Sequence, residues 1–152
     1  MSINPGMMSS TTPEWATPQE LFDRLNRQYG PFTLDPCCTE ANAKCAERFT
    51  VAEDGLEQKW TGRVFMNPPY GRKIGKWIWK AYCATRSGEA EIVVCLVPAR
   101  TDTAWWHDLC MTGEVEFIRG RVYFEQEGKS DRAPFPSAIV VFRCWPDRRA
   151  TP

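Results

Sequence analysis

The feature that most constrains the fold is an almost unbroken apolar run, EIVVCLVPA, at residues 91–99. A strand with one buried face alternates apolar and polar residues, whereas a continuous apolar run is typical of a strand buried on both faces. Such strands belong to parallel sheets whose two faces are covered by helices. The run therefore predicts an α/β fold built on a central sheet.

Helical and extended patterns alternate on both sides of this run. We expect helices at 17–30, 40–49, 74–87 and 103–112, and further strands at 32–35, 63–67 and 137–144. In the first helix Thr17 is the expected cap, Pro18 fits the first helical position, and Gly30 ends the helix. Residues 114–125 are typical of a hairpin about Gly120. The order predicts a mostly parallel sheet with antiparallel C-terminal strands at its edge.

Length and composition limit the remaining choices. The 152 residues suit one domain, which we expect at 13–145, between a flexible arm at 1–12 and a polar tail at 146–152. Zero net charge argues against binding by phosphate contacts alone, although a local basic strip stays open. Seven scattered cysteines and one histidine lack metal-ligand spacing, so no metal is expected. No signal peptide or membrane segment is visible, and we expect a cytoplasmic protein with reduced thiols.

The sequence NPPYG, residues 67–71, follows a predicted strand, and ligands of α/β sheets bind beyond the carboxyl ends of strands. Asn67 and Pro68 both precede a proline, which stiffens this backbone. The Asn67 side-chain carbonyl and the Pro68 backbone carbonyl can together accept both hydrogens of a planar amino group. Holding these hydrogens off the ring plane frees the nitrogen lone pair, while Tyr70 stacks on the ring. The corner therefore favours chemistry on a ring-bound amine.

A wider ordered set of segments accompanies this corner. It consists of WATPQELF (15–22), FTLDPC (32–37), NA (42–43), DGL (54–56), WTGRVFMNPPYG (60–71), DTAWW (102–106), GRVYF (120–124) and APFPS (133–137). NPPY alone resembles amino-methyltransferases of several substrates, but the whole set resembles the phage-type DNA N-6-adenine methyltransferases. The resemblance implies a single-domain, Rossmann-like methyltransferase sheet. It also implies S-adenosyl-L-methionine as cofactor and the exocyclic amine of adenine in double-stranded DNA as target.

The same resemblance assigns residues to roles. The catalytic residues it implies are Asn67, Pro68, Pro69 and Tyr70. The cofactor-binding residues it implies are Trp15, Thr17, Asp35, Pro36, Cys37, Asn42 and Asp54. Related enzymes have a Gly-rich turn after the position of Asp35, whereas this chain has small residues and no glycine there. The DNA-binding residues that we expect are Arg72, Lys73, Lys76, Arg100 and Arg121.

Three functions fit this pattern. The first is adenine methylation on DNA in a bacterial or phage-infected host cell, where the target base must be flipped out of the duplex. The second is methylation of a protein glutamine or an RNA base amine, because the corner chemistry is the same. The third is a non-catalytic DNA-binding relic, for which the missing glycines are the reason. The intact NPPY string argues against the third.

Overall fold

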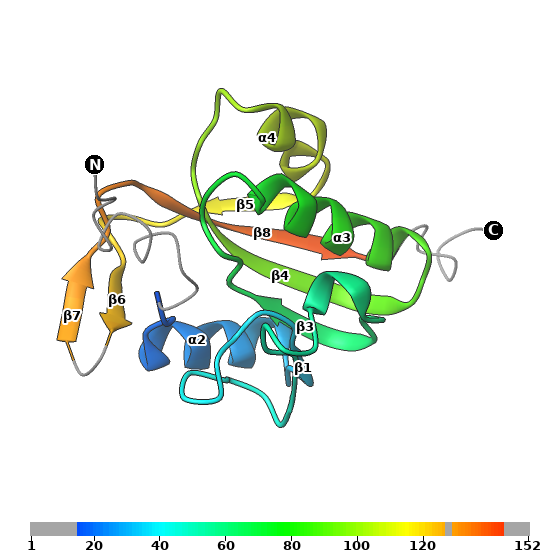
Figure 1. Cartoon of the computed structure of the whole chain (residues 1–152). Coiled ribbons are helices and arrows are strands. Elements are labelled where there is room, and N and C mark those ends of the chain that lie inside the picture. Colours follow the sequence, from blue (N-terminus) through cyan, green and yellow to red (C-terminus); the bar gives the residue numbers. More distant parts are fainter. Residues whose placement is uncertain (1–14, 127–128, 145–152) are drawn as a thin grey trace, which may run out of the picture.

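A six-stranded sheet forms the centre of the protein, in the order β2-β1-β3-β4-β8-β5 (Figure 1). The computed structural model describes residues 15–126 and 129–144. The strands of the sheet are β1 (Leu34–Asp35), β2 (Glu47–Arg48), β3 (Gly62–Met66), β4 (Ala90–Pro98), β5 (Glu114–Phe117) and β8 (Ser137–Arg143). The first four are parallel, β8 is antiparallel to β4, and β5 is antiparallel to β8. The predicted α/β fold with its mostly parallel sheet is confirmed.

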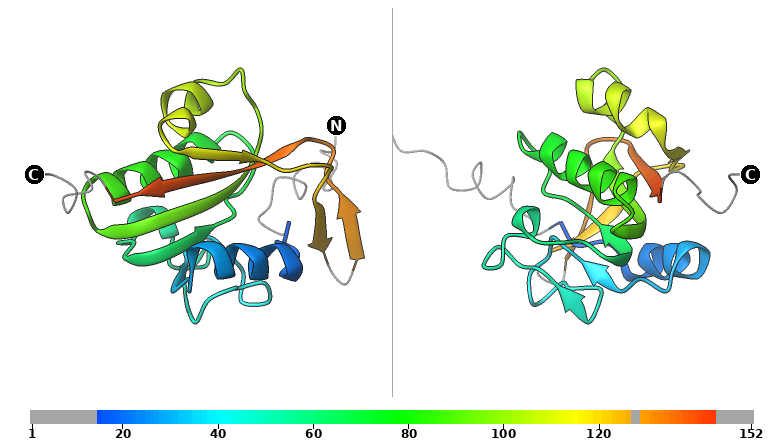
Figure 2. Two further views of the ribbon diagram at one scale, coloured as in Figure 1. Left: turned by 180° about the vertical axis from the view of Figure 1, so that it is seen from behind. Right: turned by 90° about the vertical axis from the view of Figure 1, so that its right-hand side faces the viewer.

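Helices cover both faces of the sheet, and β4 is buried between them. Helix α2 (Gln19–Tyr29) lies on one face, whereas α3 (Ile74–Arg86) and α4 (Ala104–Asp108) lie on the other (Figure 2). Alternate residues of β4 enter the two cores: Ile92, Val94 and Leu96 pack with the α2 cluster, and Val93, Cys95 and Val97 with the α3 cluster. This is the physical reason for the unbroken apolar run, since a two-sided strand has no face on which polar residues meet water.

Two predicted elements are wrong. Residues 40–49 form a turn and the short strand β2 in place of a helix. The competing interactions are local, because the Asn42 side-chain oxygen accepts from the Thr39 backbone N–H at 2.7 Å and the Lys44 N–H donates to Asp35 at 3.0 Å. Side chains of this kind draw the backbone out of helical geometry.

The hairpin predicted at 114–125 is also wrong, because its two halves pair with different partners. Strand β5 joins the main sheet beside β8, while β6 (Tyr123–Gln126) pairs with β7 (Lys129–Arg132) in a separate ribbon. Gly120 has a φ of 77°, which lets the chain leave the sheet for the ribbon. The main sheet nevertheless ends in antiparallel C-terminal strands, as predicted, with β8 beside β4 and β5 at that edge.

Smaller differences concern helix ends. The helix predicted at 103–112 is interrupted at Leu109, with α4 before it and the 3₁₀ turn η2 (Cys110–Thr112) after it. Helix α2 begins at Gln19 with Pro18 as its cap residue and without a side-chain cap, so Thr17 is not the cap that the sequence predicts. The arm predicted at 1–12 and the tail predicted at 146–152 lie outside the described residues. Within the described residues, no helix has the length and apolar character needed to cross a bilayer.

Candidate active site

The NPPY corner leaves the carboxyl end of β3, beside the end of β1, where Asp35 stands. The Cys37 thiol donates to the Asn67 backbone carbonyl at 3.3 Å and so joins the two strand ends directly. All seven cysteines are free, and burial raises the pKa of the Cys37 thiol well above its ordinary value. The thiol is therefore a neutral structural donor at this corner.

The Asn67 side chain is held by two acceptors from the segment before α2. Its Nδ2 donates to the Trp15 carbonyl at 2.7 Å and to Thr17 Oγ1 at 3.0 Å. Both amide hydrogens are used in this way, which leaves Oδ1 as an acceptor for a ligand. The Pro68 carbonyl also accepts no hydrogen bond from any residue that the structure describes. The two oxygens predicted from the sequence, Asn67 Oδ1 and the Pro68 carbonyl, therefore remain available as hydrogen-bond acceptors. Thr17 helps to orient the Asn67 side chain.

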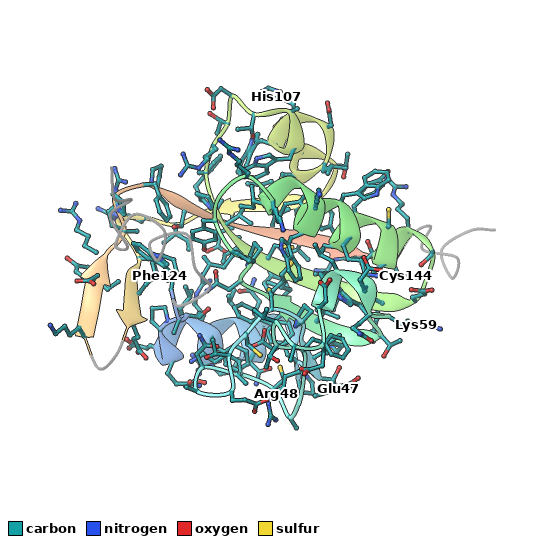
Figure 3. The ribbon with its side chains drawn as sticks, viewed as in Figure 1. Glu47, Arg48, Lys59, His107, Phe124 and Cys144 are labelled. Atoms are coloured by element: carbon teal, nitrogen blue, oxygen red, sulfur yellow. The ribbon has the colours of Figure 1, made fainter. Side chains whose placement is uncertain are left out.

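The Tyr70 ring stands between the corner and the β6–β7 ribbon. Its hydroxyl donates to the Leu96 carbonyl at 3.1 Å, and burial raises the pKa of that hydroxyl well above its ordinary value. The ring centroid lies 6.0 Å from that of Phe124 and 5.4 Å from that of Phe135, both edge-on. Phe124, labelled in Figure 3, also contacts Trp15 at 5.3 Å. These contacts hold Tyr70 in one orientation.

Phe124 and Phe135 are site residues that the sequence analysis did not single out. Both belong to quoted segments, GRVYF and APFPS, so the signal was present in the motifs. Their placement follows from the ribbon: Ala16 exchanges two backbone hydrogen bonds with Glu125 of β6, each of 3.0 Å. The segment before α2 is therefore fixed between β6 and Asn67.

A narrow recess connects this corner with Asp35. Its walls are formed by Trp15, Ala16, Thr17, Asp35, Cys37, Cys38, Asn42, Lys44, Phe65 and Asn67. The Asp35 side chain is only 4% exposed, and its Oδ2 accepts from the Lys44 backbone N–H at 3.0 Å. Burial raises the pKa of Asp35 to about 6, although the backbone N–H groups of Lys44 and Cys37 oppose the shift. The recess thus holds a carboxyl group that would be stabilised in its charged form by a cation.

A second cavity, the side pocket, adjoins the recess and has a volume of about 300 Å³. It is lined by Pro36, Cys37, Cys38, Thr50, Val51, Asp54, Gly55, Leu56, Pro69, Lys73 and Trp77. Cys37 and Cys38 line both cavities, so the two cavities share a wall, and the recess has a volume of only about 10 Å³. Asp54 adopts the left-handed conformation with φ 55°, and its Oδ1 accepts from the Leu56 N–H at 3.3 Å.

All seven residues predicted to bind a cofactor line one or both of these cavities. The structure also adds Lys44 to the recess, for which the sequence carried no signal. Asn42 lies at the recess wall, where its side-chain oxygen accepts from Thr39.

The basic residues predicted for DNA form two groups. Arg72, Lys73 and Lys76 are exposed where the corner runs into α3, and in the described part of the chain none of them forms an ion pair. Arg100 is exposed after β4, with its guanidinium carbon 5.7 Å from the centroid of the Phe135 ring. Arg121 is half-buried, and its Nη1 is fully covered without a hydrogen-bond partner.

Comparison with known proteins gives a consistent set of relatives. The family model of DNA N-6-adenine-methyltransferase (Dam) matches residues 7–151. The DNA N-6-adenine-methyltransferase of Haemophilus phage HP1 is 28% identical over 137 residues, which are 84% of this chain and 77% of that protein. That of Escherichia phage T1 is 32% identical over 95 residues, 60% of this chain and 38% of that protein. YfdM of Escherichia coli (strain K12) is 38% identical over 64 residues, 38% of this chain and 70% of that protein. The chain therefore spans less than half the length of the T1 relative.

Proposed function

Because the chain belongs to the DNA N-6-adenine-methyltransferase (Dam) family, we propose that it methylates the exocyclic amine of adenine in DNA. The proposed cofactor is S-adenosyl-L-methionine, and the proposed substrate is duplex DNA with the target adenine flipped out. Family membership supports the reaction class. The family also implies the cofactor and the DNA substrate, and the geometry of the corner and the two cavities supports the choice of residues.

The observation that carries the proposal is the hydrogen bonding of Asn67. With Nδ2 committed to Trp15 and Thr17, its Oδ1 presents an acceptor beside the unspent Pro68 carbonyl. Two acceptors at a rigid corner match the two hydrogens of an adenine N6 amine. Drawing these hydrogens off the ring plane localises the nitrogen lone pair, and the fixed corner aligns it with the methyl donor. Formation of the new C–N bond would accompany cleavage of the methyl carbon–sulfur bond of the donor, whose sulfur would leave as a neutral thioether, and the amine would then release one proton to solvent.

The residues of the two cavities fit S-adenosyl-L-methionine. The Asp35 carboxyl can pair with the methionine ammonium group if the recess, about 10 Å³ in volume, widens to admit it, and Thr17 lines the same recess. In the side pocket, Leu56, Pro69 and Trp77 provide apolar walls for an adenine ring, with the Asp54 carboxylate as an acceptor. When bound, this cofactor supplies an electrophilic methyl group on a sulfonium sulfur.

The direct test is incubation of the protein with cofactor carrying a tritiated methyl group and with unmethylated duplex DNA. We expect label in N6-methyladenine, and sequencing of the methylated positions gives the context at the same time. Label in RNA or in protein, but not in DNA, would replace the proposed substrate by one of the alternatives. Absence of cofactor binding in a calorimetric titration would identify the chain as a non-catalytic relative.

Substitutions of Tyr70 test its stacking role. We expect Tyr70→Phe to lower the methylation rate by no more than about tenfold, because only the hydroxyl contact with Leu96 is lost. Tyr70→Ala should lower it by about tenfold to a hundredfold, the range of a lost base-stacking contact. Tyr70→Asp should be the most severe, since it places a carboxylate against Phe124 and Phe135. Initial rates with saturating cofactor give the order, and equal rates for the alanine and aspartate variants would argue against stacking.

Gly55→Ala tests the side pocket. A Cβ at this position would overlap the Pro36 carbonyl oxygen, so the turn carrying Asp54 must move. We expect cofactor affinity to fall by at least about tenfold and stability by about 1–3 kcal/mol. Calorimetric titration and thermal unfolding measure the two effects.

Gly75→Ala in α3 is the matched control, because its Cβ would meet Trp105 only at ordinary contact distances, from 3.7 Å upward. Alanine in a helix interior should be neutral or stabilising there. If Gly55→Ala bound cofactor as tightly as Gly75→Ala, the side pocket would not be the cofactor site.

A further inference from the structure

Two buried polar groups on the ribbon side of the sheet have no partner. In the part of the chain that the structure describes, the buried side-chain atoms without a hydrogen-bond partner are Ser137 Oγ and Arg121 Nη1. Ser137 is only 1% exposed. A buried donor without an acceptor costs stability, so such groups are rare and call for an explanation.

Ser137 lies close to Tyr70 in the fold. Ser137 pairs with Pro98 in the β4–β8 ladder, two residues beyond the pair of Leu96 and Ile139. Leu96 is the residue whose carbonyl holds the Tyr70 hydroxyl. Two residues along a strand correspond to about 7 Å. Ser137 therefore lies about 7 Å from the level of the Tyr70 contact, towards the carboxyl end of β4. The corner lies at the same end of the sheet, because β3 and β4 are parallel.

Ser137 also points to the correct face. Side chains alternate along a strand, and Ile139 and Val141 of β8 belong to the core cluster that contains Phe124. Ser137 shares that face by the same alternation. Phe135, whose ring contacts Tyr70, is two residues before it.

Arg121 is fixed to the same place by its neighbours. The Ile118 N–H donates to the Ser137 carbonyl at 3.0 Å, and the Ala133 N–H donates to the Val122 carbonyl at 2.8 Å. The loop that carries Arg121 is thereby tied at both ends to residues 133–137. Its Nη1 lies buried within this arrangement while the residue as a whole is half-exposed.

The NPPY corner itself offers a target base hydrogen-bond acceptors and the aromatic ring of Tyr70, but no hydrogen-bond donor. Asn67 Oδ1 and the Pro68 carbonyl accept, and the Tyr70 hydroxyl is spent on Leu96. A flipped adenine nevertheless brings ring nitrogens that are acceptors, and its nucleotide brings phosphate oxygens. Unless these acceptors find donors in the protein, their lost hydration counts against binding.

We propose that Ser137 and Arg121 are the donors that position the target nucleotide, by hydrogen bonds to acceptors of its base or of its flanking phosphates. The inference rests on the proposed function and adds the residues that orient the substrate. It explains why both donors are buried without a partner in the protein alone. They are positioning residues and take no part in bond making or breaking.

The test uses the full chain and a duplex whose methylated adenine has been located by sequencing. Ser137→Ala and Arg121→Met should each lower kcat/KM for DNA by about tenfold, as expected for one lost hydrogen bond to substrate. Ser130→Ala and Arg119→Gln are the matched controls, because Ser130 is exposed on β7 and Arg119 is exposed in the segment before β6, and they should methylate as the unaltered protein does. In the absence of DNA, Ser137→Ala should unfold at the same temperature as the parent or higher, because it removes an unpaired hydroxyl.

Substrate analogues then identify the acceptor. Duplexes with 1-deaza-, 3-deaza- or 7-deazaadenine at the target position each lack one ring nitrogen. If Ser137 or Arg121 binds that nitrogen, the analogue should lower the rate of the parent but should not lower the variant's rate further. Coupling to a methylphosphonate beside the target, in place of a deaza base, would assign the acceptor to phosphate. In both experiments, a protein variant and a substrate analogue whose rate losses are not additive identify the two groups that are in contact.

Other outcomes overturn the inference. If Ser137→Ala and Arg121→Met methylate like the controls, or if their losses are additive with every analogue, the two residues do not contact the nucleotide. If Ser137→Ala lowers the unfolding temperature and leaves kcat/KM unchanged, the hydroxyl is a structural group. Failure of the unaltered protein to methylate any DNA would refute the proposed function and this inference with it, whereas methylation that is indifferent to both residues refutes the inference alone.

Discussion

Asn67→Ala is expected to reduce the rate of methyl transfer by at least about a thousandfold, a loss typical of a group that acts directly on the reacting atoms. The substitution removes the Oδ1 acceptor and also the two hydrogen bonds that hold Trp15 and Thr17. Cofactor affinity should change far less, by about tenfold at most, because Asn67 forms only one part of the recess wall. Single-turnover transfer of labelled methyl groups and calorimetric titration of cofactor separate the two quantities.

Two companion variants distinguish the functions of the Asn67 amide. Asn67→Asp keeps an acceptor oxygen but loses both donated hydrogen bonds, so it should misorient the side chain and still lose most activity. Thr17→Val removes one of the two acceptors that hold Nδ2, and it should lower the rate by about tenfold. If Asn67→Ala lowered cofactor affinity and transfer by equal factors, Asn67 would support the fold of the recess and not the reaction.

Asp35→Asn is expected to raise the free energy of unfolding at pH 8 by up to about 3 kcal/mol while lowering cofactor affinity. Burial raises the pKa of Asp35 in the folded protein to about 6, from an ordinary value of 3.8. Between these two values the folded protein binds more protons than the unfolded chain, so stability falls as pH rises from about 4 to 6. The two-unit difference corresponds to about 3 kcal/mol. An asparagine is neutral at every pH and avoids this loss.

The measurement is urea unfolding of the parent and of Asp35→Asn between pH 4 and pH 8. The two proteins should be similar near pH 4 and should diverge up to pH 7, since titrations shared by both cancel in the difference. Asp108→Asn, at an exposed position, is the matched control and should shift stability by less than about 0.5 kcal/mol. If Asp35→Asn were less stable than the parent at pH 8, the hydrogen bonds from Lys44 and Cys37 would outweigh the cost of burial.

This instability has a functional explanation. A buried carboxylate is costly in the protein alone and becomes favourable when a cation fills the recess. Cofactor binding near pH 6 should therefore release a proton from Asp35. If Asp35 binds the proposed cofactor, the expected loss of cofactor affinity in Asp35→Asn and its expected gain in stability have the same cause, which is the buried charge of Asp35.

Much of the fold could be predicted because local patterns and tertiary packing agree. The apolar run at 91–99 is β4, buried on both faces, and the periodic segments at 17–30 and 74–87 are α2 and α3. Prediction failed where the local pattern was weak. Residues 40–49 have helix-forming composition, but Thr39, Asn42 and Asp35 engage their backbone in turns. The segment 114–125 looks like a hairpin, yet β5 pairs with β8 of the main sheet and β6 pairs with β7.

The sequence alone is the source of the chemistry that we propose for the corner. The two prolines after the strand stiffen the backbone, and Asn67 and Pro68 themselves provide the acceptor oxygens. Asn67, Pro68 and Tyr70 could therefore be chosen without coordinates. These properties are covalent and local, and they do not depend on what lies nearby. The tertiary structure alone decided what surrounds the corner: the turn of the Asn67 amide towards Trp15 and Thr17, the burial of Asp35, the approach of Phe124 and Phe135, and the unpaired donors of Arg121 and Ser137. The contacts of Asn67 and Tyr70 join segments that are 50 or more residues apart in the chain, as for Asn67 and Thr17. Such contacts are set by the packing of the whole sheet, and no local sequence pattern encodes them.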